Sequence, residues 1–100
     1  MSVYFVNWNL NKEKGSAGYN KARADLLSKL ASFDRISDQG LESSMFIDAP
    51  NWNARDVSDH LRSVMDDNDR LMVVILQYPG SNYSGWLDSN VVKWLNKRVY

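Results

Sequence analysis

Two groups of residues in the second half of the chain carry side chains suited to catalysis or metal binding. Asp66, Asp67 and Asp69 form an acidic cluster that could bind a cation. Turns commonly contain Asp, so we favour a structural role for this cluster. His60 follows Asp56 by one helical turn, and Asp56 could orient it as a base, although a surface contact is the simpler interpretation. Because the chain has 1 histidine and 0 cysteines, a multi-histidine or thiolate metal site is excluded within one chain.

Basic residues follow the first predicted strand and could contact phosphates. Lys12 and Lys14 lie in a polar loop, and Lys21 and Arg23 lie in the helix after it. The loop lacks the glycine and lysine spacing of a phosphate-binding P-loop. The chain has 12 basic and 12 acidic residues, so an extensive nucleic-acid-binding surface is disfavoured because such surfaces need a basic excess. A local basic patch stays open as an alternative to an ordinary charged surface.

Length and composition indicate one globular domain. The 100 residues are 44% hydrophobic and 24% charged, which is typical of a globular protein. We expect a single domain over 1–100, with a core over 3–78 and a tail over 79–100. The N-terminus lacks the features of a signal peptide, and no apolar run reaches membrane-spanning length. We therefore expect a cytoplasmic location and no membrane partner.

The elements that position these residues alternate along the chain. Hydrophobic periodicity predicts strands over 3–10, 33–38, 41–49 and 71–76, and helices over 19–32, from 53 onwards and over 88–97. Asn53 should cap the second helix with Asp56 as its capping-box partner. This order predicts an α+β fold, a ferredoxin-like split βαβ sandwich with a C-terminal tail helix. Two helices should cover one face of a four-stranded antiparallel sheet whose first and third strands are central.

Two predicted strands are apolar on both faces. Residues 71–76 are all apolar, and both alternating sets of residues in the first strand are mainly apolar. A strand of this kind is normally buried on both sides, so the face without the two helices needs a cover. We predict that the tail and a second copy of the chain both cover it, giving a homodimer that packs sheet toward sheet. The predicted interface residues are Tyr4, Val6, Trp8, Met72, Val74 and Leu76.

Three short segments carry a resemblance to a known family. They are YFVNWNLNK in the first strand, ESSMFID in the third and DDNDRLMVVIL leading into the fourth. In their order and spacing, over residues 3–78, the chain resembles the CRISPR-associated ferredoxin-like family of small nucleases and integrase-bridging dimers, together with its SinR-like and VapD-type relatives. Members of the family have a strand ending in Tyr-Asp, a Ser-apolar-Phe segment and an Asp before the last core strand. These map onto Trp8-Asn9, Ser44-Met45-Phe46 and Asp69.

The resemblance implies a metal site that this chain has altered. In nuclease members, a symmetric pair of the strand-end aspartates at the dimer interface holds a divalent metal. Magnesium prefers anionic oxygens, and the ion must activate water and offset developing charge. Asn9 offers only a neutral carbonyl oxygen. We therefore expect no resident metal or cofactor, and a dimer that brings two Asn9 side chains near one axis.

Three functions stay open, and a non-enzymatic one is favoured. The first is a homodimer with a degenerate metal site at Asn9 and Asp69 that binds nucleic acid or a partner protein. The nucleic-acid contacts would be Lys12, Lys14, Lys21 and Arg23. The second is a metal-dependent endoribonuclease or toxin that uses Mg²⁺ or Mn²⁺ on other carboxylates such as Asp69 or Asp48. The third is a protein-binding module of a mobile element. Ser44 lacks an evident base partner and is expected to be structural.

Overall fold

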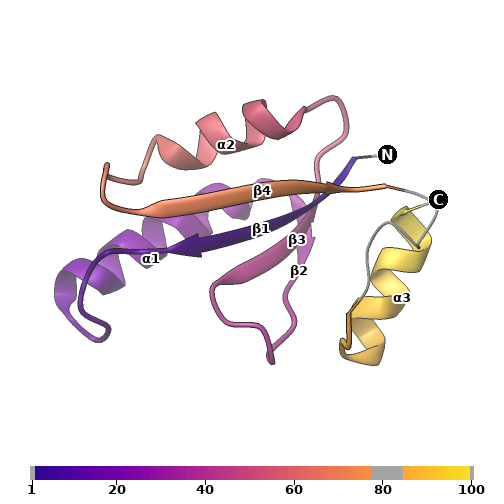
Figure 1. The fold of residues 1–100 in the computed structure, drawn as a ribbon, viewed down its shortest axis with the longest axis horizontal. Helices are drawn as coiled ribbons and strands as arrows, with labels where there is room; N and C mark the ends of the chain where they lie inside the picture. Colours follow the sequence, from indigo (N-terminus) through magenta and orange to yellow (C-terminus); the bar gives the residue numbers. More distant parts are fainter. Residues whose placement is uncertain (1, 78–84, 100) are drawn as a thin grey trace.

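The computed structural model describes residues 2–77 and 85–99, which contain the predicted elements in the predicted order. They are β1 (Val3–Asn9), α1 (Ala17–Leu30), β2 (Asp34–Ile36), β3 (Ser44–Asp48), α2 (Ala54–Arg62), β4 (Arg70–Leu76) and α3 (Ser89–Arg98) (Figure 1). Residue 78 of the predicted core and residues 79–84 of the predicted tail lie outside the described residues.

The four strands form one antiparallel sheet in the order β2-β3-β1-β4. β1 and β3 are therefore central, as predicted. Helices α1 and α2 lie on one side of the sheet and α3 lies on the other (Figure 1). This is the predicted ferredoxin-like split βαβ arrangement with an added C-terminal helix.

Caps explain where the two larger helices begin. The side chain of Ser16 accepts the Tyr19 N–H at 3.1 Å, so α1 begins at Ala17, before its first large apolar residue. The predicted capping box is confirmed in α2. Asn53 Oδ1 accepts the Asp56 N–H at 2.8 Å, and Asp56 Oδ2 accepts the Asn53 N–H at 3.0 Å.

The strand register decides which side chains share a face, and it corrects half of the predicted interface. Tyr4 pairs with Ile75 and Val6 with Val73, so these residues share one face of the sheet. On that face Tyr4, Val6 and Val73 belong to the core formed with α1 and α2. Tyr4, Val6 and Trp8 are buried in the chain's own core, so their assignment to a dimer interface is wrong. The other three residues of that prediction, on β4, point to the opposite face of the sheet.

The second face of the sheet is covered in part. Val91 and Leu95 of α3 are buried against Val3 and Phe46, so the predicted cover by the tail is confirmed at this end. Met72 of β4, on the same face, stays 63% exposed.

In the described part of the chain, the helices are too short or too polar to cross a membrane.

Candidate functional site

The end of β1 carries an exposed amide where the resemblance predicts a relic of a metal site. Asn9 is exposed and lies opposite Arg70 of β4 in the sheet register. Asn7, two residues earlier on the same face, donates from Nδ2 to the Ser43 carbonyl at 3.1 Å. The described residues contain no group of three or more His, Cys, Asp or Glu that could hold a metal ion.

Asp69 is a structural brace between two loops. Its Oδ1 accepts the Asn11 N–H at 2.8 Å, and its Oδ2 accepts the Asp66 N–H at 3.0 Å. The carboxylate thereby joins the loop after β1 to the turn before β4. Its side chain is 1% exposed, so a substrate or a hydrated cation does not reach it. This placement gives the acidic residue just before β4 a structural role.

Three of the four predicted phosphate contacts lie beside a carboxylate. Their ion pairs are Lys12–Asp66 at 2.6 Å, Lys14–Glu42 at 3.5 Å and Lys21–Asp25 at 2.8 Å. The hydrogen bond to Asp66 raises the pKa of Lys12 and lowers the pKa of the Asp66 carboxyl. Local positive charge is therefore offset at each of these lysines.

Arg23 lies with Lys14 in a hollow of about 320 Å³ between α1 and the turn before β3. Asp38 and Glu42 line the same hollow. The structure thus brings two of the four predicted cations together, but it places two acidic residues with them. The arrangement is mixed in charge rather than a basic patch.

The other candidate residues named from the sequence make hydrogen bonds or ring contacts within the fold. Ser44 Oγ donates to the Leu41 carbonyl at 3.2 Å, and the Asp56 carboxylate is used in the capping box. His60 lies edge-on to Phe33 and Trp52, with ring centroids 5.7 and 5.2 Å away. These contacts place the imidazole in an aromatic cluster at the end of the helix layer.

Asp48, the carboxylate named in the nuclease alternative, lies opposite Asp34 in the β2–β3 register. Its Oδ1 is buried, and within the described structure it has no hydrogen-bond partner. Two carboxylates directly opposite each other repel. Arg98 offsets this repulsion, because it binds Asp34 Oδ2 through Nε and Nη2 at 2.8 and 2.7 Å.

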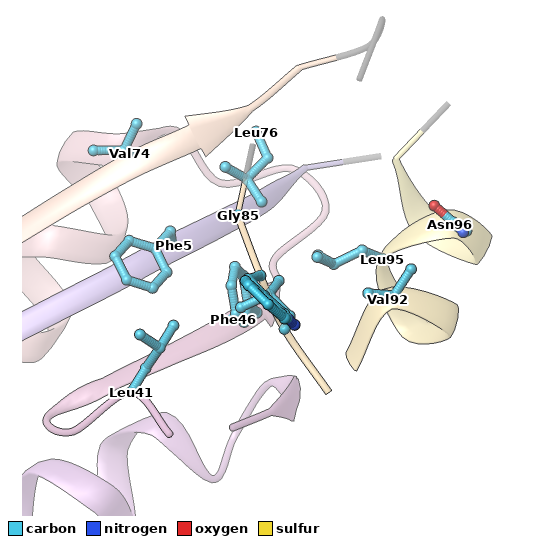
Figure 2. A pocket seen from close by; sticks show the side chains of 11 residues that line it. Phe5, Leu41, Phe46, Val74, Leu76, Gly85, Val92, Leu95 and Asn96 are labelled. Carbon is cyan, nitrogen blue, oxygen red and sulfur yellow. The ribbon is translucent and has the colours of Figure 1, made fainter. Parts of the chain in front are cut away.

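An apolar groove, which the sequence pattern alone did not predict, lies between the second face of the sheet and α3. Its volume is about 540 Å³. Figure 2 shows Phe5, Val74 and Leu76 on the sheet side and Val92 and Leu95 on the helix side. Among the described residues that line it, none is charged, and Asn96 is the polar one. A groove of this size and composition is suited to bind an apolar group.

The groove has exposed apolar residues in and around it. Trp86, which lines it, is 100% exposed, and Val74 is 42% exposed. Leu41 and Val92, two further lining residues, are also exposed. Contiguous exposed apolar surface of this kind commonly marks an interaction site.

Two polar contacts hold α3 in place as one wall of the groove. Asp38 Oδ2 accepts the N–H of Asp88, the N-cap residue of α3, at 2.7 Å. At the other end of the helix, Arg98 binds Asp34, and its guanidinium lies 4.2 Å from the centre of the Trp94 ring. The position of the groove wall is thus fixed from the β2–β3 side of the sheet.

No protein-family model, curated protein or solved structure matches the chain. The resemblance to the CRISPR-associated family therefore stays a prediction that rests on three short segments.

Proposed function

We propose that this chain is a non-catalytic protein-binding module and that the apolar groove is its binding surface. The observation that carries the proposal is a neutral groove of about 540 Å³ with a fully exposed tryptophan, Trp86, in its lining. Small-molecule binding pockets are mostly concave and apolar, and tryptophan is enriched among the residues that dominate the binding energy of protein–protein interfaces. Of the three functions considered from the sequence, this one matches the protein-binding alternative.

The surroundings of the predicted metal site argue against the nuclease alternative. Asn9 contributes no negative charge, and Asp69 is buried with each carboxylate oxygen bonded to a backbone N–H. Phosphodiester hydrolysis by a divalent ion needs accessible anionic ligands.

The predicted basic residues give little support to nucleic-acid binding. Lys12, Lys14 and Lys21 each lie within 4 Å of a carboxylate, and the chain as a whole has no net charge. Binding to a phosphate backbone depends on an excess of positive charge. The groove is the more specific feature.

The homodimer expected from the sequence is one form of this binding, and the groove changes where it would form. The groove lies at the Phe5 end of β1, whereas Asn9 lies four residues further on, about 13 Å away. A dimer centred on the groove therefore separates two Asn9 side chains instead of pairing them. Of the interface residues predicted from the sequence, Val74 and Leu76 line this groove, and Met72 lies beyond it on the same face of β4.

A fluorescence titration with the neutral apolar dye N-phenyl-1-naphthylamine, at protein concentrations low enough that the chain does not self-associate, tests the proposal. Val74 and Ile75 are neighbours on β4 with nearly equal exposure, 42% and 40%, but only Val74 is among the described groove residues. We expect Val74→Asp to weaken dye binding about tenfold or more, because a carboxylate in an apolar site is poorly solvated. The matched control Ile75→Asp should bind the dye like the unmodified chain. Equal dye binding by both variants would refute the groove as the binding surface.

A further inference from the structure

We propose that the occupant of the groove is a second copy of this chain, and that Trp86 of each protomer inserts into the groove of the other. The inference rests on the proposed function and names its partner. It assigns Trp86 as the anchor of a two-fold dimer, a role that the set of interface residues predicted from the sequence did not contain.

The chemistry of the anchor matches the chemistry of the groove. The described lining has no charged residue, so a neutral apolar group is the favoured occupant. Trp86 supplies such a group, and its side chain is 100% exposed in the single chain. A fully exposed indole gains hydrophobic stabilisation when it enters an apolar site, and its N–H can bond the amide of Asn96, the polar residue of the lining.

The location of the anchor favours a second copy over an unrelated partner. Trp86 lines the same groove that would receive its counterpart, so the projecting group and the receiving surface are adjacent on one molecule. A two-fold axis beside them forms both contacts at once and closes the assembly at two chains. Each protomer then buries its own exposed tryptophan and fills its partner's groove.

The exposed apolar side chains in and beside the groove supply most of the area that a stable dimer requires. A typical specific interface buries about 800 Å² on each partner. A fully exposed tryptophan provides up to about 250 Å² of that area, roughly a third. Leu41, Val74 and Val92 in the groove and Met72 beyond it, each between 39% and 63% exposed, together add an area somewhat larger than that of the tryptophan. The half-buried lining residues Phe5, Leu76 and Leu87 and the exposed Asn96 supply the rest.

Sedimentation velocity over a range of protein concentrations tests the proposal. We expect the unmodified chain to dimerise and Trp86→Ala to raise the dissociation constant about 30-fold or more, as a central interface tryptophan does. Because Trp86 is fully exposed, its removal leaves the core intact. Ile75→Ala, on the other face of the sheet, should change the dissociation constant less than about twofold. A monomer at every concentration, an open series of larger oligomers, or equal dimerisation by Trp86→Ala would overturn the inference.

A second measurement locates the contact. In a mixed sample of isotope-labelled and unlabelled chains, filtered nuclear Overhauser spectra should connect the Trp86 ring of one protomer with the Val92 methyl groups of the other. A dimer whose spectra lack this contact would overturn the inference while leaving the dye result intact.

The outcomes distinguish a failure of this inference from a failure of the proposed function. If the chain is monomeric but dye binding still depends on Val74, the partner is not a second copy of the chain and the proposed function stands. If Val74→Asp has no effect on dye binding, the proposed function itself fails.

Discussion

Asp38 holds the start of α3 through the backbone N–H of Asp88, a residue 50 positions further along the chain. The second oxygen of the same carboxylate accepts the Gly40 N–H at 2.8 Å. Asp88 makes no side-chain capping bond of its own, so a buried carboxylate from the β2–β3 connection stands at this helix terminus. Negative charge is favourable there because of the helix dipole. One residue thus fixes both a turn and the outer wall of the groove.

Replacing Asp38 should loosen α3 selectively. Asp38→Asn can keep an oxygen for Gly40 but lacks a second acceptor for the Asp88 N–H. We expect the free energy of unfolding to fall by about 1–2 kcal/mol in urea denaturation. Hydrogen exchange at the Val91 amide should accelerate more than at the Val6 amide in β1. Asp67→Asn, at an exposed position in a turn, is the control; equal losses in both variants would contradict the role of Asp38.

Asp69 should prove necessary for stability. Asp69→Asn retains one of two acceptor oxygens in a buried position, so either Asn11 or Asp66 loses its backbone partner. We expect a loss of about 2–3 kcal/mol, again measured by urea denaturation. A variant as stable as the unmodified chain would show that Asp69 is not a brace and would reopen its functional role.

We predict that the chain does not hydrolyse nucleic acid at the predicted metal site, and this prediction can be measured directly. The purified chain, incubated with labelled RNA or DNA and Mg²⁺ or Mn²⁺, should cleave neither substrate faster than a chelator control does. This follows from the neutral amide of Asn9 and the buried, bonded carboxylate of Asp69. Metal-dependent cleavage that survives Asn9→Ala but is lost in Asp48→Asn would support the nuclease alternative instead.

The pair of Lys12 and Asp66 should make a small pH-dependent contribution to stability. The hydrogen bond from Lys12 holds the pKa of Asp66 below its ordinary value of 3.8. A lowered carboxyl pKa gives stability that is present above the unfolded value and is lost as the pH falls through the folded value. Lys12→Met should therefore raise the pKa of Asp66 in a ¹³C-carboxyl NMR titration and flatten the acid limb of the stability curve. An unchanged pKa of Asp66 would show that the pair does not persist in solution.

The sequence predicted the elements well because local patterns define them. The apolar alternation of residues 3–10, the capping box at Asn53 and the spacing of Val91 and Leu95 are each readable within a few residues. The side of β1 that faces the helices was not readable in this way, because both of its faces are largely apolar. The register with β4 decides it, by pairing Phe5 with Val74 on the face away from α1 and α2.

The candidate site was harder to predict, since it depends on contacts between distant segments. The groove forms only when α3 is placed over Phe46, and its anchor from Asp38 to Asp88 spans 50 residues. The sequence does contain the apolar residues of the tail and an isolated tryptophan, Trp86. It does not show which surface of the folded chain these residues contact. Conversely, Asp69 drew attention because of a motif, and its buried hydrogen bonds are visible only in the folded chain.

The central claim is that the groove binds a neutral apolar group, and an NMR titration of the Trp86→Ala variant with free indole tests it most directly. This variant lacks the chain's own exposed indole, so the added ligand does not compete with a second copy. We predict that amide shifts concentrate at groove residues such as Phe5, Val74 and Val92, and that adding Val74→Asp abolishes them. Shifts centred instead on the cluster of Phe33, Trp52 and His60, or no saturable shifts at all, would contradict the claim.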